Sequence, residues 1–252
     1  MPRSNIAWTA IFSNYFSKHD FNKEPAILTA EMIKNVTHKF KKTSEREVRI
    51  LAKMDSREEV PKILKDKGLF VLPIKNGKYA ITKGEGFVDI PTITSPAVEY
   101  SSKLEFPLDT SVVGNSEMQH LDYAYAVSVI RTFIDDPTLV LTIRGRKRTP
   151  KFEFNVRKFS LEVEGVQTEV DAGYEGKDKV VLLEAKNSET TNTIIRQLYY
   201  PFRKWKLATN KKVLNVFFEK RGSIYSLWQF EFIDPDNYNS IKLVKSARYK
   251  IV

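Results

Sequence analysis

Residues 170–186 read VDAGYEGKDKVVLLEAK, and this stretch indicates both a fold and a chemistry. The apolar run at 180–183 predicts a strand buried on both faces. Because side chains alternate along a strand, Glu184 and Lys186 would point the same way where the run ends. Asp171 would reach them from the neighbouring strand. Two carboxylates suit a hard cation such as Mg²⁺, so Asp171 and Glu184 are the predicted metal ligands.

These residues resemble the motif of the PD-(D/E)xK nuclease superfamily, and especially that of its type II restriction endonucleases. Residues 193–205 are similar to the helix that follows the Glu-x-Lys strand in that superfamily, and residues 167–171 are similar to its central hairpin. The pattern of elements extends over roughly residues 115–220. The superfamily's usual Pro before the Asp is Val170 here, at a position that varies within the superfamily.

The resemblance implies site-specific cleavage of double-stranded DNA by a mixed α/β core that uses Mg²⁺, with Mn²⁺ as a substitute. It makes Asp171, Glu184 and Lys186 catalytic. Lys186 would activate the attacking water or stabilise charge on the phosphate, and both roles stay open. Cutting both strands usually needs two active sites, which implies a homodimer or a transient dimer.

Other interpretations of the motif stay open. Glu-x-Lys occurs often by chance, and surface carboxylates near lysines are usually solvated ion pairs. The nuclease interpretation is favoured because an acidic strand and an apolar strand precede the motif, an amphipathic helix follows it, and the chain is basic. Two rival functions are a repair or recombination nuclease with little sequence preference and a winged-helix regulator that binds DNA without cutting it.

Three more polar residues are predicted beside the motif, as additional metal ligands or as residues that orient the ligands. Glu117 lies in the first turn of a helix predicted from Ser116 to Phe133, where the superfamily often provides another Glu. An acidic residue there also suits the helix dipole. Glu169 shares a strand face with Asp171. Gln197 lies one turn into the helix after the motif.

The N-terminal part of the chain predicts helices followed by a hairpin. The helices are expected at 27–36, 48–54 and 56–68, and the strands, joined by an Asn-Gly turn, at 69–74 and 78–82. The third helix would start with a Ser-x-x-Glu box at Ser56 and Glu59. This order is typical of a winged helix, although a small packing domain is the alternative. We predict a winged-helix-like DNA-recognition domain at 1–95 and an endonuclease domain at 96–252, because the Pro-rich residues between about 82 and 114 lack a sustained period.

Two groups of cations are predicted to contact DNA. In the first domain they lie on the third helix and at the hairpin tip: Arg57, Lys62, Lys65, Lys67, Lys75 and Lys78. In the second domain a strand at 138–143 is followed by a predicted turn that contains Arg144, Arg146, Lys147 and Arg148. A solvated surface is the alternative for both groups. Further strands are expected at 159–165, 166–171, 213–218 and 223–232.

Composition limits the classes of function. Lys and Arg number 41 against 31 Asp and Glu, and this net charge of +10 favours a polyanionic partner, with double-stranded DNA first. The absence of cysteine excludes disulfides, thiolate zinc sites and a cysteine nucleophile. The three histidines are too scattered for a metal cluster. No long apolar segment is present, so we expect a soluble cytoplasmic protein with no membrane partner and no organic cofactor.

Overall fold

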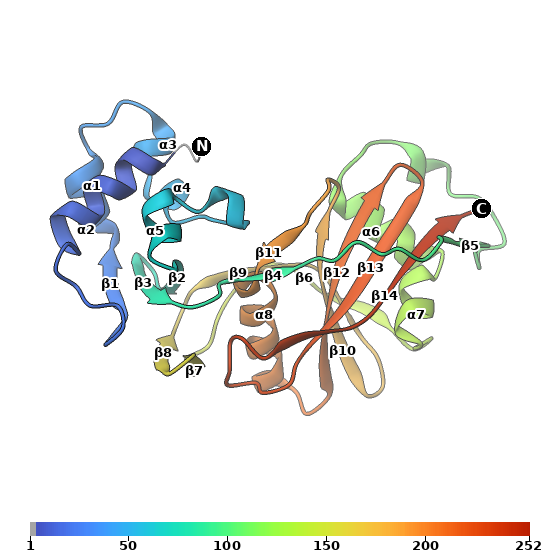
Figure 1. The fold of residues 1–252 in the computed structure, drawn as a ribbon. Helices are drawn as coiled ribbons and strands as arrows, with labels where there is room; N and C mark the ends of the chain where they lie inside the picture. The colour runs from blue at the N-terminus through green and yellow to red at the C-terminus, as the bar shows by residue number, and fades with distance from the viewer. Residues whose placement is uncertain (1–3) are drawn as a thin grey trace.

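The computed structural model describes residues 4–252 as a mixed α/β chain with a large mixed sheet, and this much of the predicted fold class is confirmed (Figure 1). Residues 4–83, called the N-terminal unit here, form helices and a three-stranded antiparallel sheet in the order β1-β3-β2. Its elements are α1 (Asn5–Tyr15), β1 (Ala26–Thr29), α2 (Ala30–Thr37), α3 (Thr43–Arg46), α4 (Val48–Leu51), the 3₁₀ turn η1 (Arg57–Glu59), α5 (Lys62–Asp66), β2 (Leu69–Lys75) and β3 (Lys78–Lys83).

The predicted helix at 27–36 begins later than expected. Ile27 and Leu28 belong to β1, and α2 starts only at Ala30 because the Thr29 side chain caps it, accepting a hydrogen bond from the backbone N–H of Met32 at 3.1 Å. The hairpin of β2 and β3 has its predicted turn, where Gly77 has a positive φ of 71°.

The predicted helix at 56–68 is wrong in its first half. Ser56 makes no side-chain cap, and Glu59 instead accepts a hydrogen bond from the backbone N–H of Asp55 at 2.7 Å. Pro61 keeps the preceding Val60 extended, with ψ at 125°, because the proline ring disfavours a helical residue before it. The segment is therefore divided into η1 and the short α5.

Residues 84–252, called the C-terminal unit here, are built on a seven-stranded mixed sheet in the order β5-β14-β13-β12-β10-β9-β6. These strands are β5 (Val98–Tyr100), β6 (Val140–Arg148), β9 (Gln167–Glu175), β10 (Lys179–Lys186), β12 (Lys212–Arg221), β13 (Ile224–Phe232) and β14 (Ile241–Ile251). The remaining elements are β4 (Phe87–Asp89), η2 (Asp109–Val112), α6 (Glu117–Ala126), α7 (Val129–Ile134), β7 (Phe152–Val156), β8 (Phe159–Val163), β11 (Asn192–Ile194) and α8 (Ile195–Ala208). Strand β10 is parallel to β12, and α8 is the crossover that connects them.

The two faces of this sheet carry different helices. Leu182 of β10 belongs to the same apolar cluster as Leu198 of α8, whereas the next residue, Leu183, belongs to a second cluster with Leu121 of α6. Alternation along β10 therefore places α8 on one face and α6 with α7 on the other. Glu184 and Lys186 lie two and four residues after Leu182, so their side chains are on the same face of the sheet, the one that α8 covers.

Three predictions for the C-terminal unit are corrected. The helix expected from Ser116 to Phe133 is divided at Ser128, whose φ is 72°, into α6 and α7. The turn expected at 144–148 is instead the second half of β6, paired with β9. Asp171 was expected at the end of its strand, but β9 continues to Glu175 because this stretch pairs with both β6 and β10.

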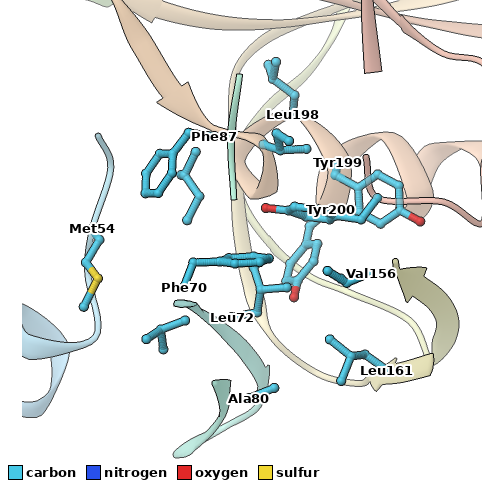
Figure 2. Packing of buried hydrophobic residues seen from close by; sticks show 14 of the residues in the cluster. Met54, Phe70, Leu72, Ala80, Phe87, Val156, Leu161, Leu198, Tyr199 and Tyr200 are labelled. Carbon is cyan, nitrogen blue, oxygen red and sulfur yellow. The ribbon is translucent and has the colours of Figure 1, made fainter. Parts of the chain in front are cut away.

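One apolar cluster extends through both units (Figure 2). The ring of Phe70 in β2 stacks on Tyr238, with 5.8 Å between centroids. Tyr200 of α8 donates a hydrogen bond from its hydroxyl to the carbonyl oxygen of Pro73 in β2 at 2.9 Å. The N-terminal hairpin is therefore packed directly on the C-terminal unit. Between residues 4 and 252, the helices include none with the length and apolar character that a bilayer crossing requires.

Candidate functional site

The three motif side chains meet where β9 and β10 run side by side. Asp171 Oδ2 accepts a hydrogen bond from the backbone N–H of Ala185 at 2.8 Å. On β10, Lys186 Nζ donates to Glu184 Oε1 at 2.6 Å. The Asp171 carboxylate is thus attached to the residue between Glu184 and Lys186, and the structure brings all three together.

Helix α8 adds a fourth side chain to this group. Gln197 Nε2 donates to Glu184 Oε1 at 2.9 Å, and Gln197 Oε1 in turn accepts from Thr193 Oγ1 at 2.8 Å. Because Thr193 fixes the orientation of the Gln197 amide, its N–H group points at Glu184. Gln197, which the sequence suggested as a ligand or an orienting residue, touches Glu184 in the structure and holds it in place.

The ionisation of Glu184 is strongly perturbed. Its side chain is only 9% exposed, and burial raises its pKa to about 7. The nearby charge of Asp171 contributes to this rise, while the charge and hydrogen bond of Lys186 oppose it. A carboxylate of this kind holds a proton near neutral pH unless a positive charge stabilises its ionised form.

Asp171 and Lys186 are shifted by the same neighbourhood. Burial raises the pKa of Asp171, although the N–H of Ala185 and the ammonium of Lys186 lower it. Burial would lower the pKa of Lys186, but the charge and hydrogen bond of Glu184 outweigh it and raise that pKa. A buried carboxyl group and two half-buried charged groups that shift one another's pKa are typical of functional sites.

The motif residues line a cleft of about 880 Å³ between the two units. The N-terminal unit contributes Arg49, Ile50, Lys53, Asp55 and Tyr79, among others, and the C-terminal unit contributes Glu117, Glu169, Arg196 and Gln197 together with the motif residues. The group is therefore open to a ligand large enough to touch both units.

Glu117 and Glu169 both lie in this cleft. Glu117 is the first residue of α6, where Ser116 caps the helix, and its charge acts on Asp171 and Lys186. Glu169 lies two residues before Asp171 and pairs with Arg146 at 3.3 Å between Nε and Oε2. Both add negative charge around the motif.

The cations predicted to contact DNA are mostly engaged within the protein. Arg57 pairs with Asp89 and Glu85, Lys62 with Asp66, Lys75 with Glu164 and Arg144 with Asp122, while Arg148 donates to the carbonyl oxygen of Gly165. Lys78 lies at the exposed start of β3, Lys65 and Lys67 in and just after α5, and Lys147 opposite Thr168 in β6. None of these residues lines the cleft.

Sequence reasoning missed the residues that the N-terminal unit adds to the cleft. The charge of Asp55 contributes to the raised pKa of Glu184, although 129 positions in the chain separate the two residues (184 − 55). Arg49 lies on α4. No local pattern identifies Asp55 and Arg49, because their role depends on how the two units pack. The C-terminal unit adds Arg196, one residue before Gln197 on α8.

The donor set fits a divalent cation in one respect. Asp171 and Glu184 are neighbouring carboxylates whose burial and mutual repulsion a cation would relieve. Among residues 4–252 no group of three or more His, Cys, Asp or Glu side chains is arranged to hold a metal. Mg²⁺ is commonly held by one or two carboxylates with waters and substrate phosphates, so two such ligands suffice for that ion.

Comparison with known proteins gives families without an assigned activity. A family model described as Domain of unknown function (DUF6997) matches residues 82–250, and another, described as Domain of unknown function (DUF6996), matches residues 5–81. None of the curated proteins and none of the solved structures matches the chain.

Proposed function

The chain belongs to the DUF6997 family, and we propose that it is a Mg²⁺-dependent endonuclease of the PD-(D/E)xK type that cuts double-stranded DNA. One observation carries this proposal. Asp171 is bonded to the backbone between Glu184 and Lys186 at the surface of a cleft that both units line. Two neighbouring carboxylates and an ammonium are the groups that metal-assisted phosphodiester hydrolysis uses.

The order of elements around the site supports the same proposal. Helices α6 and α7 are followed by the antiparallel strands β6, β9 and β10, then by α8 and by β12 parallel to β10. The resemblance to the nuclease superfamily implies a mixed sheet with a hairpin before, and a helix after, the Glu-x-Lys strand, and this order supports the proposal. The two acidic motif residues lie on β9 and β10, the central pair of that pattern.

Each side chain of the site has a role in the proposed reaction. Asp171 and Glu184 would hold Mg²⁺, which supplies Lewis acidity toward the phosphate and lowers the pKa of a bound water. Gln197 keeps Glu184 in a fixed position. Lys186, hydrogen-bonded to Glu184, places an ammonium where negative charge develops on a phosphate bound at the two carboxylates.

The N-terminal unit supports a DNA substrate. Its order of helix, strand, helices and hairpin (α1, β1, α2 to α5, β2, β3) resembles a winged helix. The narrower form of the proposal is a type II restriction endonuclease that works as a homodimer or transient dimer in the cytoplasm.

The proposal is tested by incubating purified protein with a plasmid of known sequence in Mg²⁺ and in chelator. We expect Mg²⁺-dependent cutting that falls at least about 100-fold in Asp171→Ala, Glu184→Ala and Lys186→Ala. Glu153→Ala is the matched control, because this carboxylate is exposed on β7 outside the cleft. Circular dichroism spectra equal to that of the wild type would show that each variant is folded.

The outcomes separate the competing functions. Discrete fragments indicate site-specific cleavage, and smears or nicks at DNA structures indicate a repair or recombination nuclease. Specific DNA binding without cutting in any divalent metal would indicate a regulator. Cutting by the alanine variants at the wild-type rate would refute the assignment of the site.

A further inference from the structure

Two arginines lie on opposite walls of the cleft. Arg49 lies on α4 in the N-terminal unit and is exposed, and Arg196 lies on α8, one residue before Gln197. The ion pairs among residues 4–252 include no acidic partner for either guanidinium. In contrast, Lys53 in the same cleft pairs with Asp55 at 2.9 Å.

The cations that the sequence predicted to contact DNA differ from these two arginines, because none of them lines the cleft. Arg57, Lys62 and Lys75 each pair with a carboxylate of the protein. A cation already paired gains less from a phosphate, since the existing pair must be broken first. The positive charge that remains available beside the acidic motif is therefore that of Arg49 and Arg196.

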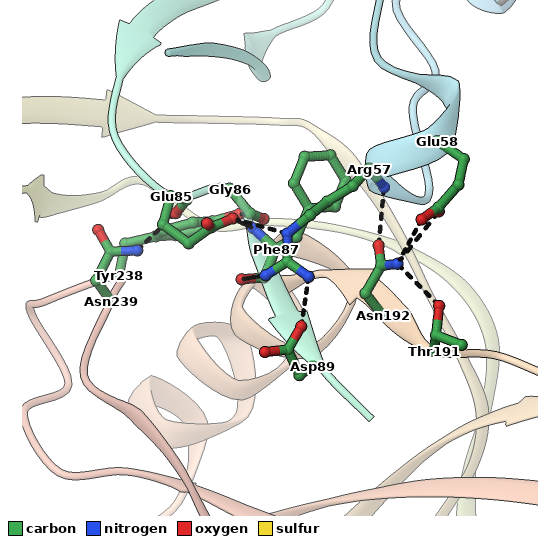
Figure 3. A network of polar contacts seen from close by, with 10 residues as sticks. All are labelled: Arg57, Glu58, Glu85, Gly86, Phe87, Asp89, Thr191, Asn192, Tyr238 and Asn239. Atoms are coloured by element: carbon green, nitrogen blue, oxygen red, sulfur yellow. Dashed lines mark hydrogen bonds and ion pairs between the residues drawn. The ribbon is translucent and has the colours of Figure 1, made fainter. Parts of the chain in front are cut away.

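The distance between the two walls is fixed by polar contacts between the units (Figure 3). Asn192 of β11 accepts a hydrogen bond from the backbone N–H of Arg57 at 2.8 Å and donates to the carboxylate of Glu58 at 3.1 Å. The backbone N–H of Ile194 also donates to the carbonyl oxygen of Asp55 at 3.0 Å. The segment after α4 is thus bonded to the strand that leads directly into α8.

Each wall is also anchored in its own unit. Trp8 of α1 donates from its indole N–H to the carbonyl oxygen of Leu51 at 3.1 Å, which attaches the end of α4 to a buried ring. Tyr200 attaches α8 to β2. The two helices that carry the arginines are therefore held in place before any ligand enters, so less backbone entropy is lost on binding.

The surface near Arg49 is partly apolar. Ile50 is 38% exposed, and the half-buried Tyr79 lies in the same cleft. Cations beside an aromatic and an aliphatic side chain suit the alternating phosphates, sugars and bases of a nucleic-acid strand. A small anion, in contrast, would contact only the charged side chains and would leave Ile50 and Tyr79 without a partner.

We propose that Arg49 and Arg196 form a phosphate clamp, in which each binds a backbone phosphate of a DNA strand on one side of the phosphate held at Asp171 and Glu184. This inference rests on the proposed function, because it takes the DNA strand to lie at the two carboxylates. It assigns binding of the DNA phosphate backbone to the cleft rather than to α5 or to the tip of the β2–β3 hairpin. Contacts of this kind set the position of the strand and carry no sequence information.

The clamp is tested by DNA binding rather than by cutting. The affinity of the full-length protein for a fluorescein-labelled DNA duplex is measured by anisotropy in Ca²⁺ over a range of KCl concentrations. Each duplex phosphate contact contributes about 0.9 to the slope of log K against log[KCl]. We expect Arg49→Ala and Arg196→Ala each to reduce the slope by about 0.9 and to weaken binding roughly 5- to 10-fold at moderate salt.

Conservative and distant variants make the result specific. Arg49→Lys and Arg196→Lys keep the charge and should retain the wild-type slope. Lys250→Ala removes an exposed cation on β14, outside the cleft, and should leave the slope unchanged. An unchanged slope in both arginine-to-alanine variants, or an equal loss in Lys250→Ala, would overturn the clamp.

Failure of the clamp is distinguishable from failure of the proposed function. Cutting in Mg²⁺ by the wild type reports the nuclease independently of the salt slope. If the wild type cuts DNA while the slopes of the arginine variants stay unchanged, the nuclease stands and the clamp is wrong. If the slopes fall as expected but no metal supports cutting, the clamp stands and the nuclease proposal is wrong.

Discussion

Glu184 couples its own ionisation to the stability of the fold. Its pKa is 4.5 when solvated and about 7 in the folded protein, because burial disfavours the charged form. Because folding raises this pKa, the protonated Glu184 carboxyl group contributes its full share of the free energy of unfolding below pH 4.5. That contribution is lost as the pH rises to about 7 and the group ionises. The charge is therefore costly at neutral pH in protein without metal.

Replacing Glu184 with Gln should remove this pH dependence. We expect Glu184→Gln to gain roughly 3 kcal/mol in free energy of unfolding relative to the wild type between pH 4.5 and about 7, because the amide does not ionise. Urea unfolding in chelator at several pH values measures the difference. The exposed Glu153→Gln is the control, and a pH-independent difference between Glu184→Gln and the wild type would contradict this account.

At the scale of residues, part of the site followed from the sequence. Strand alternation placed Glu184 and Lys186 on one side of a buried strand, and the structure has them hydrogen-bonded. Arg49 and Asp55 could not be found in this way. They meet the motif only because the two units pack against each other, and no spacing along the chain encodes that packing.

Strand β6 shows why one element was misjudged. Four cations in residues 144–148 predicted a turn, yet they form the second half of β6 because β9 supplies the partner strand. Arg146 stands opposite Glu169, and the two side chains pair across the ladder. Such cross-strand neighbours are absent from the local sequence, whereas the apolar run of β10 is visible in it.

Gly173 allows β6 and β9 to approach each other closely beside the site. A Cβ at this position would lie 2.7 Å from Cβ of Ile143, a contact that forces the strands to shift. We expect Gly173→Ala to lower the free energy of unfolding by about 1–3 kcal/mol, as overpacking typically does. Chemical denaturation measures this loss.

A double variant identifies the cause. If the clash with Cβ of Ile143 is responsible, Gly173→Ala combined with Ile143→Gly, which removes that Cβ, should be more stable than the sum of the single changes predicts. Gly165→Ala provides the control, because a Cβ there meets no atom within 4 Å and only its φ of 66° is unfavourable. Strict additivity at Gly173 and Ile143 would contradict the steric explanation.

At the scale of the whole molecule, the shared apolar cluster implies that the two units unfold together. The cluster includes Phe21, which packs on Phe12 in the N-terminal unit, and Phe70, which stacks on Tyr238 in the C-terminal unit. The sequence predicted two regions with different composition, but it gave no indication that their apolar residues form one core. That continuity depends on contacts between distant residues.

Calorimetry of two phenylalanine variants tests this cooperativity. Phe21→Ala and Phe70→Ala should each lose about 3–5 kcal/mol and keep a single thermal transition at a lower temperature. Phe106→Ala is the control, because this side chain is 62% exposed. Two separate transitions, with Phe21→Ala lowering only one of them, would show that the units are independent.

The stacking of Phe70 on Tyr238 limits how this protein can be re-engineered. A chimera with another domain in place of residues 4–83 would need an aromatic ring at the position of Phe70 and a carbonyl oxygen that accepts the Tyr200 hydrogen bond. A replacement domain without these groups would leave an apolar cavity beneath α8 and would leave the Tyr200 hydroxyl without its hydrogen-bond acceptor. Exposed residues of α4 can therefore be substituted in place with less loss of stability than an exchange of the whole N-terminal unit would cause.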